Sequence, residues 1–191
     1  NIYLKNTILK NVKENEIIFL DKWDKGYYIR GNDIYYEAIK LDGININDFQ
    51  YINSERSFSY IKSTKNVYLY GKKIIGADPK TFKISFEGYL ISQDKNHVYF
   101  WDKEIENADA PTFEALNGEY GKDKNRVYYN SRVVRKADPA TFQILEGPFS
   151  KDKNYVYVTG EIFEKADVKT FQTLGDYGYA KDKRYVYRYN K

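Results

Sequence analysis

The sequence contains no cysteine, no methionine and a single histidine, His97. Without cysteine the chain has no disulfide, no thiolate nucleophile and no cysteine-ligated metal. One histidine with no second ligand and no nucleophile partner is also a weak basis for catalysis. The sequence has no glycine-rich phosphate loop and no metal-ligand cluster. We therefore expect no cofactor, no metal site and no catalytic residue, and interpret the protein as a non-enzyme.

Long apolar runs are also missing, and no stretch of about eighteen apolar residues is available to span a membrane. Basic and acidic residues nearly balance, with 31 Lys and Arg against 27 Asp and Glu. They are dispersed along the chain, whereas nucleic-acid-binding proteins usually cluster their basic residues. We therefore expect no transmembrane segment and no nucleic-acid partner. Because the chain opens on Asn1 without a signal peptide, it fits a mature exported protein of the periplasm or cell surface, with the cytoplasm as the alternative.

What the sequence has in abundance is aromatic side chains, including 21 Tyr and 11 Phe. Together with the β-branched residues around them, these side chains favour strands over helices. Short alternating stretches such as 125–129 point the same way. The composition therefore predicts a mainly β protein with enough apolar surface for a core.

Two short patterns recur along the chain with a period of about thirty residues, which indicates a tandem repeat. One is a Val-Tyr pair, found at Val67-Tyr68, Val98-Tyr99, Val127-Tyr128, Val156-Tyr157 and Val186-Tyr187. The other is an Asp-x-x-Thr-Phe element, which ends at Phe82, Phe113, Phe142 and Phe171. Ile34-Tyr35-Tyr36 and Asn47-Asp48-Phe49 form a more divergent copy. We expect a cap over 1–21, followed by repeats near 22–62, 63–93, 94–122, 123–151, 152–181 and, in part, 182–191.

Each repeat can be built from turn and cap chemistry. Asp-Lys-Asn suits a tight hairpin turn, because Asp accepts backbone N–H bonds and Asn tolerates positive φ. A second turn follows near Thr159-Gly160 and leads into a third strand. Asp138-Pro139 is typical of a helix start, with Asp as the N-cap and Pro at the first position. We predict a three-stranded antiparallel meander plus one short helix, in which Phe142 and Leu145 face the same way.

Such a repeat cannot bury its apolar face alone, so neighbouring repeats must stack. We expect an open elongated array. The alternative is a closed propeller-like ring, completed by a strand from 1–20. The open array is favoured because about thirty residues are few for a four-stranded propeller blade.

The block from Ser150 to Tyr157, followed by Ala166-Asp167 and Thr170-Phe171, resembles the DKNYY repeat family of bacteria. The resemblance covers 60–191 well and 22–60 loosely. It implies a bacterial, often exported protein, and it implies no activity and no catalytic residues. In an early copy, Ser63 takes the place of the Asp that begins the Asp-Lys-Asn turn, so this Asp is not required in every turn.

Candidate partner-binding residues are the aromatic side chains. If equivalent tyrosines line up and face outward, they form a stripe that could stack on sugars or grip a peptide; the competing interpretation is that they pack between strands and repeats. Residues that do not follow the repeat are the other candidates. The predicted sites are Trp23, Trp101, Tyr99, Tyr128 and Tyr157.

Two functions fit these features best, and a third, an enzyme such as a glycan hydrolase that uses only carboxylates, is disfavoured because no set of residues with catalytic geometry can be named. The first is an exported binding or surface-scaffold module that holds an unknown protein or glycan partner on its repeats. The alternative is an immunity or inhibitor protein that blocks a toxin or enzyme through irregular residues such as Trp23, Trp101 or 50–62.

Overall fold

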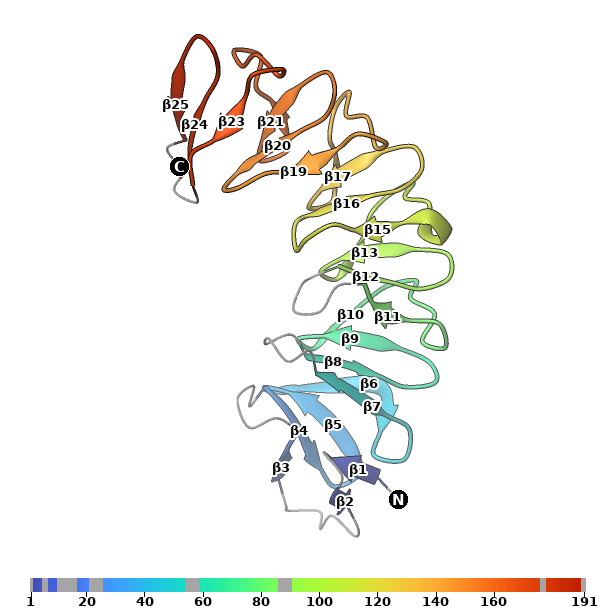
Figure 1. Cartoon of the computed structure of the whole chain (residues 1–191). Helices are drawn as coiled ribbons and strands as arrows, with labels where there is room; N and C mark the ends of the chain where they lie inside the picture. The colour runs from blue at the N-terminus through green and yellow to red at the C-terminus, as the bar shows by residue number, and fades with distance from the viewer. Residues whose placement is uncertain are drawn as a thin grey trace. The chain divides into compact units, whose positions relative to one another are not determined.

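The computed structural model describes residues 2–4, 7–9, 17–20, 26–53, 59–85, 91–175 and 178–189. The chain divides into two compact halves, Asn1–Glu104 and Ile105–Lys191, which we describe separately. Both are built from small antiparallel sheets that follow one another along the chain (Figure 1). The prediction of a mainly β protein is therefore confirmed.

The N-terminal half begins with a two-stranded ribbon, β1 (Ile2–Leu4) and β2 (Thr7–Leu9). The first four-stranded sheet consists of β3 (Ile17–Phe19), β4 (Tyr27–Arg30), β5 (Asp33–Tyr36) and β6 (Ile39–Asn45). The second consists of β7 (Gln50–Asn53), β8 (Ser59–Lys62), β9 (Val67–Leu69) and β10 (Lys72–Lys73). The third consists of β11 (Lys83–Ile84), β12 (Ile91–Gln93), β13 (Val98–Phe100) and β14 (Lys103–Glu104).

The C-terminal half repeats the same meander. After a short 3₁₀ helix, η1 (Ala110–Thr112), its first sheet consists of β15 (Glu114–Ala115), β16 (Tyr120–Lys122), β17 (Val127–Tyr129) and β18 (Arg132–Val133). The next consists of β19 (Gln143–Ile144), β20 (Phe149–Lys151), β21 (Val156–Val158) and β22 (Glu161–Ile162). The last consists of β23 (Gln172–Thr173), β24 (Tyr179–Lys181) and β25 (Val186–Arg188).

The helix predicted in each repeat is not shown by the structure. Asp78 does collect cap-type bonds, from the Lys80 N–H (3.1 Å) and the Thr81 hydroxyl (3.0 Å). A single helical turn closes when the Phe82 N–H donates to the Asp78 carbonyl at 3.0 Å. The chain then extends at once into β11, because its backbone groups bond to β12 instead of to a second helical turn. Among the described residues, η1 is the one segment of this kind that reaches a short helix.

The residues predicted as the end of that helix form a strand, which gives four strands where three were expected. Gln143 pairs with Lys151 and Ile144 with Ser150, so β19 opens the sheet that β20, β21 and β22 continue. Because β19 is extended, Phe142 and Leu145 do not share a face: Phe142 packs with Val127 and Tyr157, and Leu145 packs in the following cluster. The expectation that they face the same way was wrong.

The described strands of the first twenty residues pair with one another or with their neighbour in sequence. β1 pairs with β2, and β3 pairs with β4, so the first sheet begins inside the segment predicted as a cap. Neither strand completes the last sheet, as the ring alternative required. Within the described ranges no helix is long and apolar enough to cross a membrane.

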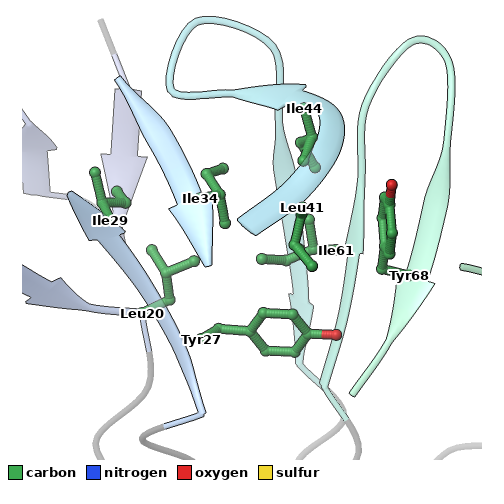
Figure 2. Packing of buried hydrophobic residues seen from close by; sticks show 8 residues of the cluster. All are labelled: Leu20, Tyr27, Ile29, Ile34, Leu41, Ile44, Ile61 and Tyr68. Atoms are coloured by element: carbon green, nitrogen blue, oxygen red, sulfur yellow. The ribbon is translucent and has the colours of Figure 1, made fainter. Parts of the chain in front are cut away.

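The core lies between successive sheets. In the N-terminal half, Leu20, Ile29, Ile34, Leu41 and Ile44 from the first sheet pack against Ile61 and Tyr68 from the second (Figure 2). Tyr27 bridges the two: its ring is buried among them, and its hydroxyl oxygen accepts a bond from the Gly71 N–H at 2.9 Å.

The C-terminal half has the equivalent arrangement. Val127 is buried against Phe142 and Tyr157 of the following repeat. The Tyr120 hydroxyl reaches across to the next sheet, where it accepts a bond from the Gly160 N–H at 2.8 Å and one from the Ser150 hydroxyl at 3.2 Å. At these two places, one sheet is held to the next by apolar packing and by one buried tyrosine hydroxyl.

Candidate functional site

The Asp of each Asp-Lys-Asn turn (the DKN turn) is a buried hub of hydrogen bonds. At Asp152 one carboxylate oxygen accepts bonds from the N–H groups of Asn154 (2.7 Å) and Tyr155 (2.8 Å), which closes the predicted turn. The other oxygen accepts bonds from the Asp138 N–H (2.8 Å) and the Tyr157 hydroxyl (2.9 Å). The side chain is 4% exposed, so these four donors take the place of water around a buried charge.

The same four contacts recur in four repeats. Their hubs are Asp94, Asp123, Asp152 and Asp182. Each hub ties its own turn to the preceding Asp-x-x-Thr-Phe segment (the DxxTF loop) and to a tyrosine of the following strand. The DKN turn was predicted from sequence, but the tie to the DxxTF loop was not. The sequence did contain a signal for this tie, since the Asp of the DxxTF loop and the hub Asp recur 14 to 16 residues apart.

The Lys and Thr of the motifs complete this tie. Lys153 forms an ion pair with Asp138 at 2.6 Å, and its backbone N–H donates to the Thr141 hydroxyl at 3.2 Å. Equivalent ion pairs join Lys95 to Asp78, Lys124 to Asp109 and Lys183 to Asp167. The recurring residues of the family pattern therefore act in joining the DKN turn to the DxxTF loop, and a structural role accounts for them.

The repeat that lacks the Asp keeps half of the arrangement. The Ser63 hydroxyl oxygen accepts bonds from the Lys65 and Asn66 N–H groups, both at 3.1 Å. It cannot also reach a tyrosine, and the Tyr68 hydroxyl donates to the Asp42 carbonyl instead, at 2.5 Å. A hydroxyl can therefore form the turn, while the bonds that a hub carboxylate makes to the preceding loop are replaced here by those of the Thr64 N–H and hydroxyl to Asp48.

Hydrogen bonding shifts the pKa values of these groups in opposite directions. Burial raises the pKa of the Asp94 and Asp123 carboxyls, but the hydrogen bonds donated to them outweigh burial, so that the pKa is lowered. The same balance holds the pKa of Asp182 well below its usual range. On the tyrosine side, burial and then the hydrogen bond to Asp123 raise the pKa of Tyr128 to about 12, and Tyr187 is raised to about 12 in the same way beside Asp182.

These shifts predict that stability is lost at both ends of the pH scale. Carboxyls whose folded pKa is depressed contribute stability above their unfolded pKa of 3.8, and this is lost as the pH falls below about 4. Tyr128 and Tyr187 have a raised folded pKa, so their contribution is complete below pH 10.0 and is lost as the pH rises toward about 12. Urea unfolding from pH 2 to 12 should show a plateau between about pH 5 and 9, and tyrosinate absorbance should lag behind that of free tyrosine. Stability that keeps rising below pH 4 would contradict the assignment.

Tyr99, Tyr128 and Tyr157 do not form an exposed stripe. All three are fully buried. Each ring packs on the Phe of the preceding DxxTF loop, with centroid separations of 6.3, 6.0 and 5.8 Å. Each hydroxyl donates to its hub Asp. These tyrosines are therefore unavailable to a partner. The strand β17 is buried on both faces, because Val127 packs against Phe142 and Tyr157 on one side and Tyr128 packs against Phe113 on the other.

Trp101 lies in the two-residue turn between β13 and β14 and is 41% exposed. This turn position has a left-handed backbone in five repeats, at Glu37, Tyr70, Trp101, Asn130 and Thr159. The rings of Tyr70 and Trp101, from successive turns, lie 6.3 Å apart. Bulky aromatic residues are unusual at positive φ, where Gly and Asn are preferred.

The other residues considered from the sequence are Trp23, the segment 50–62 and His97. Trp23 lies outside the described residues. The segment 50–62, expected to be irregular, contains β7 and β8, which pair as the first two strands do in other sheets. His97 is partly exposed beside its own hub, with Nδ1 3.4 Å from Asp94. In the part of the chain that the structure describes, no group of three or more His, Asp or Glu residues is arranged to hold a metal ion.

The fold and the recurring tie define a tandem repeat protein made of four-stranded β meanders. The chain belongs to the DKNYY family, whose model matches residues 1–103 and again residues 98–191. The resemblance seen in the sequence is thereby confirmed and extends over the divergent first copy. No curated protein and no solved structure matches the chain.

Proposed function

We propose that the protein is a non-catalytic binding module of the bacterial cell envelope, which holds a partner against the two-residue turns of its N-terminal half. Trp101 is the anchoring side chain and Tyr70 the ring beside it. The observation that carries the proposal is the exposed Trp101 side chain on a left-handed backbone, at φ 60°.

The backbone of Trp101 makes a purely structural role a poor explanation. A non-glycine residue in the left-handed region costs about 1–2 kcal/mol, and this cost is lowest for Asn. The equivalent residue of the next repeat is Asn130, which shows that the turn does not need an aromatic ring. Nor is the tryptophan there to fill the core, since 41% of it is exposed. Strain held together with an exposed aromatic surface is typical of a binding site.

Replacing Trp101 by the asparagine of the following repeat should separate binding from folding. We expect Trp101→Asn to change the free energy of unfolding by less than about 1 kcal/mol, because relief of backbone strain offsets the lost ring contact. Binding to envelope material should weaken at least about tenfold. Stability is measured by urea unfolding followed by circular dichroism, and binding by co-sedimentation with cell walls. Asn130→Ala, at the equivalent turn of the C-terminal half, is the control.

The outcomes distinguish the alternatives. Destabilisation above about 3 kcal/mol would show that Trp101 is a packing residue and would overturn the proposal. Unchanged binding would overturn it as well. Capture of one soluble protein at a fixed 1:1 ratio, with no binding to cell walls, would favour an immunity or inhibitor protein. Fractionation of the producing bacterium tests the proposed location, which the cytoplasmic fraction alone would contradict.

A further inference from the structure

Two surface grooves occupy the same place in two different repeats. One lies in the N-terminal half with a volume of about 340 Å³, and the other lies in the C-terminal half with a volume of about 390 Å³. Each is bounded by the first two strands of a sheet, by the turn that follows them and by the next DxxTF loop. That turn is Ser63-Thr64 in the first groove and the DKN turn at Asp152 in the second. The corresponding residues are Gln50, Lys62 and Lys80 in the first groove and Gln143, Lys151 and Lys169 in the second.

The strand register explains why the same side chains meet in both grooves. Gln143 lies directly opposite Lys151 in the pair β19–β20, as Gln50 lies opposite Lys62 in β7–β8. Side chains directly opposite each other in an antiparallel pair project from the same face of the sheet. An amide and an ammonium group are therefore presented side by side, and the lysine of the next DxxTF loop approaches from the other wall.

The groove of the C-terminal half has an excess of hydrogen-bond donors. The Asp152 carboxylate is saturated by four donors, and Lys153 is held by Asp138 at 2.6 Å. Within the described part of the chain, Lys151 and Lys169 form no ion pair. Two lysines and one glutamine amide are thus available, with no competing carboxylate, which is a setting for an anion.

The groove of the N-terminal half is arranged in a similar way. The Lys62 ammonium donates to the Pro79 carbonyl at 2.9 Å, which holds it across the groove. The one carboxylate in the lining, Asp48, is engaged by the N–H (3.0 Å) and the hydroxyl (2.7 Å) of Thr64. Lys80 is exposed at the edge.

We propose that each groove binds a phosphate group of a phosphodiester or polyphosphate chain, held by Lys151, Lys169 and Gln143 in the C-terminal half and by Lys62, Lys80 and Gln50 in the N-terminal half. Lysine is a compact point charge suited to phosphate, whereas planar carboxylate recognition typically uses arginine. Nucleic acid is disfavoured because no aromatic side chain lines the C-terminal groove to stack a base. Within one groove, a polymer can place neighbouring phosphates beside both lysines, an avidity that free phosphate lacks.

One repeat carries the same register without the other two groups of the site. Glu114 takes the place of the glutamine opposite Lys122, and the two form an ion pair at 3.7 Å. In its next DxxTF loop, Ala140 takes the place of Lys80 and Lys169. Changing Glu114 to Gln and Ala140 to Lys together supplies both missing groups, so the chain offers a double substitution that should create binding as well as ones that should remove it.

The test is calorimetric titration of the full chain with long-chain polyphosphate and with inorganic phosphate. We expect the polymer to bind at least about tenfold more tightly per phosphate than inorganic phosphate. The double substitution Lys151→Gln and Lys169→Gln should weaken polymer binding about tenfold and reduce its salt dependence. The matched control, Arg135→Gln with Lys165→Gln, removes two exposed charges of the same half outside the groove and should have little effect. Glu114→Gln combined with Ala140→Lys should tighten binding about threefold, whereas the same change of charge at exposed positions outside the grooves, Glu161→Gln with Ser131→Lys, should not.

Three results would overturn the proposal. Equal losses in the groove variant and its control would show diffuse attraction only. No gain from Glu114→Gln with Ala140→Lys beyond that of Glu161→Gln with Ser131→Lys would show that the amide and the two ammonium groups are not the site. Binding of poly-L-glutamate or single-stranded DNA as tight as that of polyphosphate would show that phosphate is not selected. The inference is independent of the Trp101 site, so Trp101→Asn should leave polyphosphate binding unchanged.

Discussion

Asp152→Asn is expected to destabilise the protein by about 3 kcal/mol or more. The asparagine carbonyl can still accept bonds from the Asn154 and Tyr155 N–H groups. Its amide, however, is a donor and would face the Asp138 N–H, which now lies 2.8 Å from a carboxylate oxygen. Buried donors left without an acceptor cost about 1–3 kcal/mol each, and bonds to a charged acceptor are the stronger kind. Asp152 is 4% exposed, so water cannot replace the lost contacts.

Urea unfolding of three variants tests how this carboxylate acts. Asp152→Ser copies Ser63, which keeps the turn and gives up the tie, and should fall between the wild type and Asp152→Ala. Tyr157→Phe should cost about 1–2 kcal/mol, and a double-mutant cycle with Asp152→Ala should show a coupling above about 0.5 kcal/mol. Asp102→Asn, in a two-residue turn, should change stability by less than about 0.5 kcal/mol. A loss as small for Asp152→Asn as for Asp102→Asn would contradict the hub.

Gly160→Ala is the second substitution with a large expected effect, about 2–4 kcal/mol. Gly160 has φ 82°, and a Cβ added there would lie 2.6 Å from the Cβ of Tyr129. The methyl group would therefore force apart the contact through which the Gly160 N–H donates to the buried Tyr120 hydroxyl at 2.8 Å. Backbone strain and loss of packing both act against the folded state.

Gly175 supplies the matched control for this substitution. Its φ is 86°, nearly the same, but a Cβ added there has no atom within 4 Å. Gly175→Ala should cost only the backbone strain, about 1–2 kcal/mol. The difference between the two variants in the free energy of unfolding then reports the packing of Gly160 against Tyr129. Equal losses would show that packing of the turn against the preceding sheet contributes nothing.

The proposed binding sites lie outside this framework. Trp101 and Lys169 stand at positions that the repeat leaves variable, and Lys151, which recurs as Lys62, Lys122 and Lys181, makes none of the four hub contacts. The hubs, their tyrosines and the DxxTF Phe residues are committed to packing. Substitutions at the hubs should therefore reduce binding only through unfolding. Those at Trp101, Lys151 or Lys169 should act on binding while the fold is kept.

Sequence alone determined the period, the strand-rich composition and the DKN turn, because these follow from local chemistry. A turn selects Asp and Asn by what their side chains bond within a few residues. The family resemblance followed from the same local motifs.

Tertiary structure decided the rest. Alternation along Val127-Tyr128-Tyr129 indicates that neighbouring side chains lie on opposite faces of the strand. It does not indicate that both faces are buried, as they are at Val127 and Tyr128. Asp138-Pro139 fits a helix start as well as a turn, and the choice was made by strand pairing of the next residues with β20. The tie between each DKN turn and the DxxTF loop, and the grooves beside it, depend on residues brought together from different parts of the chain. Local sequence preferences do not specify which distant segments pack together. That packing buries the tyrosines and places Gln143 opposite Lys151.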